Sequence, residues 1–121
     1  MKKVLLTLCV AASLAACKKD DCAREDFIGT WTGTEKCDLE NAVDVTINIT
    51  AGSASDEVII DGGRFIDEVV EVDGCDLDGG TTVLGIGTKI TGSLEEGKLT
   101  LSFDNDAGLI SVGCDYNLTK K

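Results

Sequence analysis

Apolar and polar residues alternate along three stretches of the chain. Between Val43 and Thr50, every second residue is valine or isoleucine and the residues between them are polar. The same alternation occupies Lys98–Phe103 and Ile110–Leu118. Because successive side chains of a strand point to opposite faces, a period of two is typical of a strand with one buried face. We therefore predict a half-buried β-strand at each of the three stretches.

Further strands are predicted between these stretches, and residues typical of turns separate them. The additional strand candidates are Val58–Asp61, Arg64–Asp73 and Thr81–Leu94. Turn residues, mostly Gly, Asp, Asn and Ser, gather between the candidates at residues 51–53, 61–63, 78–80, 95–97 and 104–108. Strands that recur about every ten residues with short connections favour an antiparallel meander. The predicted fold is all-β, a small β-barrel or alternatively a β-sandwich, preceded by a short helical turn near Asp21–Phe27.

The N-terminal segment has the pattern of a cleaved export signal. Two lysines follow Met1, and Val4–Ala16 is an apolar run that ends in small residues. The run is too short for a stable transmembrane helix, so we predict a secretory signal peptide over residues 1–16 that is removed from the mature chain. Residues 14–17 (LAAC) resemble the lipobox of bacterial lipoproteins, which implies that Cys17 is acylated. The alternative is an ordinary signal peptide with a chance cysteine near its end.

A short charged segment follows Cys17. Residues 18–21 (KKDD) resemble the export signal of surface lipoproteins of Bacteroidota, and the alternative is a plain hydrophilic tether. We divide the chain into the signal peptide at 1–16, the lipidated cysteine and charged tether at 17–26, and a β-barrel domain at 27–121. The expected location is the outer membrane, with a lipid anchor at Cys17 and the domain on the cell surface or facing the periplasm.

The excess of acidic residues and the absence of histidine argue against several classes of partner and activity. The chain has 11 basic and 22 acidic residues, and removal of Lys2 and Lys3 changes the net charge from −11 to −13. Nucleic acid needs positive charge, so we expect no nucleic-acid partner. The chain has no histidine, which removes the commonest general base and metal ligand. We predict no enzymatic activity, cofactor or metal site. Two acidic clusters, at 73–78 and 104–108, could be taken for calcium-binding loops, but they do not fit the EF-hand pattern. Asp, Asn and Gly are ordinary turn residues, so we interpret both clusters as turns.

A Gly-x-Trp motif at residues 29–31 resembles the entry motif of lipocalins. The chain is more closely similar to small lipocalin-like lipoproteins of Bacteroidota, through the sequence GTWTG at 29–33, the cysteines at 37 and 114, and Thr119-Lys120. The resemblance implies a small lipocalin-like barrel that binds a small apolar ligand, and inward glycines such as Gly33 and Gly92 would leave room for one. The candidate ligand-binding residues are Trp31, Val45, Ile47, Leu101, Phe103 and Tyr116.

The cysteines predict two disulfides. The chain has six cysteines, of which Cys9 leaves with the signal peptide and Cys17 is acylated. Four cysteines remain, and in an exported protein they can form two disulfides in three possible pairings. The alternative is a metal site of four cysteines, but the sequence has no closely spaced Cys pair such as C-x2-C. In a closed meander the first and last strands are antiparallel neighbours. If Trp31 points inward, so do Cys37 and Cys114, which favours a Cys37–Cys114 disulfide and leaves Cys22 to pair with Cys75.

This pairing fixes a register that can be tested. If Cys37 lies opposite Cys114 in an antiparallel ladder, Trp31 lies opposite Lys120. The ammonium group of Lys120 would then sit over the indole face, where a cation is attracted to the ring. In this position Lys120 would replace the arginine that lipocalins carry on their last strand.

Two function classes remain open. The first is a membrane-anchored lipoprotein that binds a small apolar ligand inside the barrel. The alternative is a protein-interaction or enzyme-inhibitor module on the cell surface, which uses acidic loops against a basic partner whose identity the sequence does not give. Because one fold serves many functions, the fold by itself does not decide between them.

Overall fold

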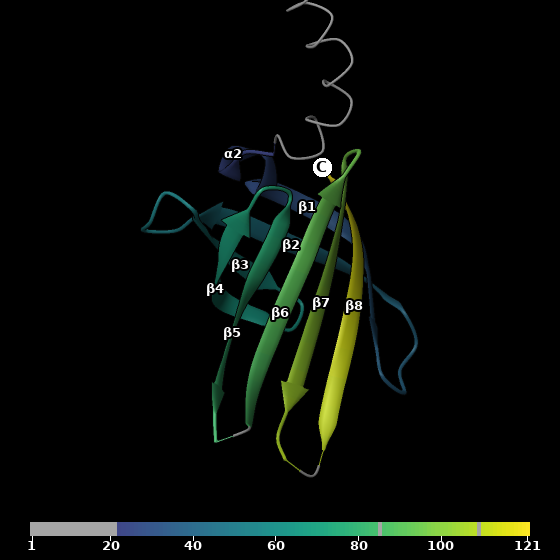
Figure 1. Ribbon diagram of the computed structural model, residues 1–121. Coiled ribbons are helices and arrows are strands. Elements are labelled where there is room, and N and C mark those ends of the chain that lie inside the picture. The colour runs from purple at the N-terminus through teal and green to yellow at the C-terminus, as the bar shows by residue number, and fades with distance from the viewer. Residues whose placement is uncertain (1–21, 85, 109) are drawn as a thin grey trace, which may run out of the picture.

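Eight strands follow one another around a closed barrel, and each pairs antiparallel with the next (Figure 1). The computed structural model describes residues 22–84, 86–108 and 110–121; the predicted signal peptide and Cys17 lie outside these residues. The elements are α2 (Arg24–Phe27), β1 (Gly29–Cys37), β2 (Val43–Ala51), β3 (Glu57–Gly62), β4 (Phe65–Asp73), β5 (Asp76–Val83), β6 (Ile86–Glu95), β7 (Lys98–Asp106) and β8 (Ser111–Lys120). The predicted all-β meander and its closure as a barrel are confirmed, and the sandwich alternative is wrong.

The barrel closes where β8 returns to β1. The ladder between these strands runs from Trp31 opposite Lys120 to Cys37 opposite Cys114, which is the predicted register. A disulfide joins Cys37 to Cys114, and the Lys120 ammonium lies 5.2 Å from the centre of a ring of the Trp31 indole. The prediction succeeds because closure brings the first and last strands together, parity places both cysteines on the inward face, and their disulfide sets the register.

The inward faces of the strands form one apolar core. Among the residues of the alternating stretches, Ile47, Ile49, Leu99 and Leu101 are all buried. The aromatic side chains meet in the barrel interior, where the ring centre of Phe65 lies 5.4 Å from that of Phe103 and 5.0 Å from that of Tyr116. The remaining members of the core are Phe27, Trp31, Cys37, Val58, Ile60, Val70, Leu77, Ile90, Cys114 and Leu118.

Two local predictions are wrong. The turn expected at residues 78–80 lies inside β5, and the real connection between β4 and β5 is formed by Gly74 and Cys75. The single strand expected at Thr81–Leu94 is divided, because β5 ends at Val83 and β6 begins at Ile86. Both errors arise because glycine marks turns and also occurs where a strand kinks.

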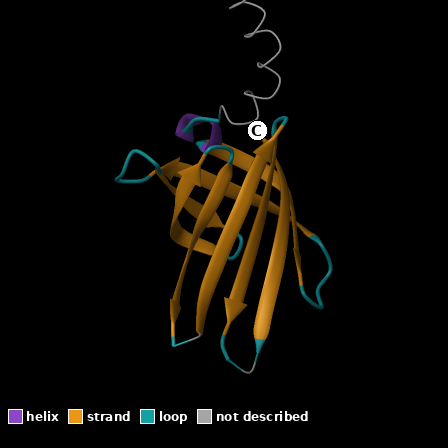
Figure 2. Cartoon of the chain, in the orientation of Figure 1, coloured by secondary structure: helices purple, strands orange, loops and turns teal. Residues whose placement is uncertain are grey.

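The N-terminal segment covers one end of the barrel. A disulfide joins Cys22 to Cys75 in the β4–β5 turn, as predicted. The Trp31 indole N–H donates a hydrogen bond to the Phe27 carbonyl at 2.9 Å, and the Lys120 ammonium donates one to the Asp26 carbonyl at 2.9 Å. Figure 2 shows α2 lying across this end, which we call the cap end.

The opposite end of the barrel, which we call the far end, carries the other four connections. They are the loop at 38–42, the β3–β4 turn at 63–64, and the connections after β5 and β7. The β3–β4 turn lies higher than its neighbours, so β5, β6, β7 and β8 extend beyond it (Figure 1). The short β3–β4 hairpin thus leaves part of β5 without a neighbour on its β4 side.

Candidate functional site

The predicted ligand-binding residues lie in the packed core. The side chains of Trp31, Ile47, Leu101, Phe103 and Tyr116 are all buried, the first with 1% of its surface exposed. A ligand in the interior would therefore have to displace core side chains. The prediction that these residues bind a ligand stays a prediction.

Val45, the sixth predicted ligand-binding residue, is half-buried against the core. It also lines an open hollow on the wall formed by β1 and β2. The hollow has a volume of about 470 Å³ and is lined by Thr32, Gly33, Asp44, Val45 and Thr46.

The inward glycines do not leave room for a ligand. A Cβ atom on Gly33 would lie 1.9 Å from the backbone oxygen of Asn117, so the glycine is needed for the close approach of β1 and β8. A Cβ atom on Gly92 would lie 2.7 Å from a methyl group of Leu101 and 3.3 Å from one of Leu77. The space beside Gly92 is thus filled by leucine, and the expectation of free space at these glycines is wrong.

A hydrogen-bond chain that begins at the buried Tyr116 side chain and ends at an exposed salt bridge lies at the far end of the barrel. The Tyr116 hydroxyl donates to the Glu35 carboxylate and accepts a hydrogen bond from the Arg64 backbone N–H at 3.1 Å. The Arg64 guanidinium in turn forms a salt bridge with Glu40 at 3.2 Å. Burial raises the pKa of Tyr116 well above its ordinary value, and the hydrogen bond to Glu35 raises this pKa further. These hydrogen bonds hold the β3–β4 turn against β1 and β8.

One group of potential metal ligands occurs among the described residues. Ligand atoms of Glu35, Cys37 and Cys114 lie within 4.8 Å of one another. The two sulfur atoms are bonded to each other, and a metal ligand must be a thiolate. This group therefore serves as a disulfide with a carboxylate beside it.

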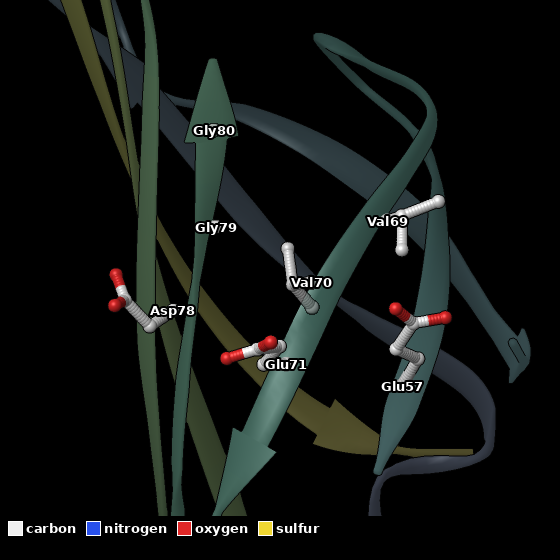
Figure 3. Close-up of a pocket in the computed structure, with 7 residues that line it drawn as sticks. All are labelled: Glu57, Val69, Val70, Glu71, Asp78, Gly79 and Gly80. Carbon is white, nitrogen blue, oxygen red and sulfur yellow. The ribbon is translucent and has the colours of Figure 1, made fainter. Parts of the chain in front are cut away.

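The seam between β4 and β5 is only partly paired. The ladder joins Val70–Asp73 to Asp76–Gly79 near the cap end and stops there. β5 continues to Val83 and pairs with β6 on its other side. Within the described part of the chain, no residue of β4 pairs with Gly80–Val83. Figure 3 shows β4 curving away from β5 beyond Val70.

Kinks in both strands explain why they part. Gly80 has a φ of +115°, and a Cβ atom there would lie 2.0 Å from the backbone oxygen of Thr88. On β4, Asp67 has a φ of +47°, and its backbone N–H is held by the Asp61 carboxylate at 3.3 Å. A residue in this left-handed region bends a strand away from its partner. The seam therefore opens toward the far end from Gly80 onward.

An acidic hollow lies where the two strands separate. Its volume is about 380 Å³, and Val70 and Gly79 lie where the ladder stops (Figure 3). Three carboxylates border it, in a row across β3, β4 and β5: Glu57 lies opposite Glu71, and Glu71 lies opposite Asp78. Like charges at directly opposed positions destabilise a sheet. Among the described residues no basic side chain forms a salt bridge with them.

Exposed apolar side chains gather at the far end and around the seam. Six of the seven large exposed ones belong to far-end connections or to positions close to the start of strands that begin there: Leu39, Val43, Ile66, Leu84, Ile86 and Ile110. The seventh, Val69, lines the seam hollow. None of the described side chains of this kind lies at the cap end. The confinement of large exposed apolar side chains to one part of the described barrel makes that part the candidate interaction surface.

Sequence reasoning misses the seam because residues 78–80 (DGG) have the composition of a turn. The available signal is the pair of glycines directly before the β-branched residues 81–83 (TTV), since a glycine inside a strand often marks a bulge or a close backbone approach.

Comparisons with protein-family models, with curated proteins and with solved structures found no match for this chain. The one described helix, α2, has 4 residues and is far too short to cross a membrane. The fold and the surface of the barrel are therefore the basis for a functional proposal.

Proposed function

We propose that this chain is a membrane-anchored, lipocalin-like lipoprotein whose barrel binds a protein partner through its far end. The observation that carries the proposal is the segregation of exposed apolar side chains, which occupy the far end and the seam and are absent from the described cap end. The core is filled by its own side chains. Both findings favour protein interaction over storage of a small apolar ligand.

The position of the cap gives the proposed anchor an orientation. Cys22 is bonded to Cys75 at the cap end, and the proposed lipid attachment at Cys17 precedes it by five residues. Five residues span at most about 18 Å. The cap end of a lipidated protein would thus lie close to the membrane, with the far end directed away from it.

The charge of the protein suits a basic partner. The chain carries 22 acidic residues against 11 basic ones, and acidic side chains border the seam hollow. Complementary charge accelerates encounter and excludes wrong partners. The apolar side chains of the far end would then supply the contact that stays dry once the partner is bound.

Site-specific photocrosslinking in cells tests the proposal. A crosslinking amino acid replaces either Leu84 at the far end, 95% exposed, or Glu96 in the β6–β7 turn at the cap end. We expect the far-end probe to give a discrete protein adduct and the cap-end probe to give none. Equal labelling from both ends, or labelling from the cap end alone, would show that the far end is not the binding surface.

Mass spectrometry of the purified native protein tests the anchor. We expect a mature chain that begins at Cys17 with acyl groups attached, and a Cys17→Ser variant that is released from the membrane. A mature mass that still includes residues 1–16 would rule out the lipoprotein assignment. A small apolar molecule that co-purifies in stoichiometric amount would favour the ligand-binding alternative.

A further inference from the structure

We propose that the β4–β5 seam binds an extended segment of a protein partner, which pairs with the free edge of β5 and carries lysine or arginine at the end that reaches the hollow. This inference rests on the proposed function, because it names the chemistry of the partner. The observation that supports the inference is that Gly80–Val83 of β5 have no β4 neighbour in the described chain.

An unpaired strand edge is a template for another strand. Alternate residues of Gly80–Val83 direct their backbone N–H and C=O groups away from β6 and toward the gap. Natural proteins protect such edges with bulges, charges or covering loops. β4 curves away from this edge (Figure 3), and no described residue of β4 pairs with it. Addition of a strand would supply the missing backbone hydrogen bonds, as in peptide recognition by sheet extension.

The direction of the bound segment follows from the direction of β5. β5 runs from the cap end to the far end, and an added strand is most stably antiparallel to it. The segment would enter from the far end and run toward the point where Val70 pairs with Gly79. Its first residues would meet the exposed apolar side chains of Ile66 and Leu84. Its last residues would lie beside Val69 at the hollow.

The carboxylates at the hollow define the other end of the segment. Glu57, Glu71 and Asp78 lie in adjacent register positions around the point where the ladder stops. The Glu57 carboxylate accepts hydrogen bonds from the Ser53 hydroxyl and the Ala54 N–H, and no basic side chain of the described residues forms a salt bridge with the row. A lysine or arginine at the C-terminal end of the segment would lie among these carboxylates.

Selection from a random peptide library tests the inference without assuming a sequence. Phage that display random peptides of about ten residues, long enough for one strand, are selected against the purified protein. We expect enriched peptides that contain a β-branched stretch followed by lysine or arginine. A synthetic copy of the most enriched peptide should slow hydrogen exchange at amides of Gly80–Val83. Failure to enrich such peptides, or protection at another surface, would overturn the inference.

Two valines of equal exposure provide a matched pair of variants. Val69 at the seam is 51% exposed, and Val43 at the start of β2 is 52% exposed. We expect Val69→Lys to weaken binding of the selected peptide at least about fivefold, because a cation beside the hollow repels the basic end of the peptide. Val43→Lys should leave binding of the seam peptide unchanged, because Val43 lies on β2 and outside the β4–β5 seam. An equal loss in both variants would show a general charge effect and contradict a specific seam site.

A second pair of variants tests the role of the carboxylates. Neutralisation of the hollow by Glu71→Gln with Asp78→Asn should weaken binding about five- to tenfold. Neutralisation of Glu95 and Glu96 to glutamine, in and beside the β6–β7 turn at the cap end, should have no effect. Peptide binding that tolerates the seam variants would contradict the assigned contact.

Failure of this inference and failure of the proposed function give different results. If the far-end crosslink in cells survives Val69→Lys and the seam peptides do not bind, the partner uses the far end without the seam. If seam peptides bind and no far-end crosslink forms in cells, the seam recognises strands but the proposed binding of a partner at the far end is wrong.

Discussion

The barrel has two seams on opposite sides, between β8 and β1 and between β4 and β5, and they are built differently. The first has a continuous ladder from Trp31–Lys120 to Cys37–Cys114 and is covalently joined. The second has a ladder of Val70–Asp73 with Asp76–Gly79 and then opens. The first ladder thus includes β1 from Trp31 to its last residue, whereas at the second seam Gly80–Val83 of β5 have no partner on the β4 side.

The two seams also differ in what surrounds them. The β8–β1 seam lies beside the Glu35–Tyr116 hydrogen bond and under the cation of Lys120. The β4–β5 seam lies beside carboxylates without basic partners and exposed aliphatic side chains. Stabilising contacts are thus concentrated at one seam, and the features of the proposed binding site lie at the other, as expected if binding sites have low local stability.

The largest expected effect comes from opening the closed seam. Replacement of Cys37 and Cys114 by serine removes a crosslink between residues 77 positions apart. The chain-entropy relation gives a loss of about 4–5 kcal/mol in unfolding free energy. Urea denaturation of the oxidised proteins measures the difference. A loss below about 1 kcal/mol would show that the β8–β1 ladder does not depend on its disulfide.

A smaller loss of unfolding free energy is expected from replacing Gly80, the glycine at the kink of the open seam. Gly80→Ala should cost about 3 kcal/mol, because Gly80 has a φ of +115° and its Cβ would clash with the Thr88 backbone. Gly97 is the matched control, since its φ is +80° and a Cβ atom there would have no neighbouring atom within 4 Å. Gly97→Ala should cost about 1 kcal/mol. Equal costs for the two variants in urea denaturation would argue against a tight kink at Gly80.

The buried tyrosine at the closed seam should make stability depend on pH in the alkaline range. The pKa of Tyr116 is raised in the folded protein, so above about pH 10 the unfolded chain loses a proton that the folded chain keeps. The stabilisation is fully present below that pH and is lost as pH rises further. Unfolding free energy should fall by up to about 1.4 kcal/mol per pH unit relative to Tyr116→Phe. Parallel pH profiles for both proteins would contradict burial of the phenol.

The smallest expected effect concerns the cation over the indole. Lys120→Ala should lower the unfolding free energy by about 0.5–1 kcal/mol, because it removes the contact with Trp31 and the hydrogen bond to the Asp26 carbonyl. Lys121→Ala, which changes the neighbouring exposed lysine, is the control and should have no measurable effect. Equal losses would indicate a general effect of net charge.

The closed seam is predictable from the sequence and the open seam is not. The alternation of apolar residues indicates which side chains point inward, and closure of a meander brings Cys37 and Cys114 onto neighbouring strands, where their disulfide sets the register. At the open seam, the DGG sequence at 78–80 has the chemistry of a turn but occupies a strand. Whether these residues form a turn or a strand depends on how far β3 and β4 extend beside them. That is a property of the tertiary pairing rather than of any local pattern.

The candidate site illustrates the same limit. The composition predicts acidic loops against a basic partner, but the row of Glu57, Glu71 and Asp78 comes from three strands whose relative register the sequence does not define. The exposed aliphatic residues at the far end also follow the strand pattern. Leu84 and Ile86 share the parity of buried Ile90 but lie at the connection between β5 and β6, where no core remains to cover them.

Amide hydrogen exchange of the free protein, resolved by residue, tests the split seam most directly. We predict that amides of Gly80–Val83 on the β4 side exchange as unpaired groups do. Those of Val70–Asp73 and Asp76–Gly79 that join β4 to β5 should be protected, as should Leu99–Phe103 in β7. Protection of all four amides of Gly80–Val83 to the level of β7 would show that the edge of β5 is already paired, and would contradict a binding site for a partner strand.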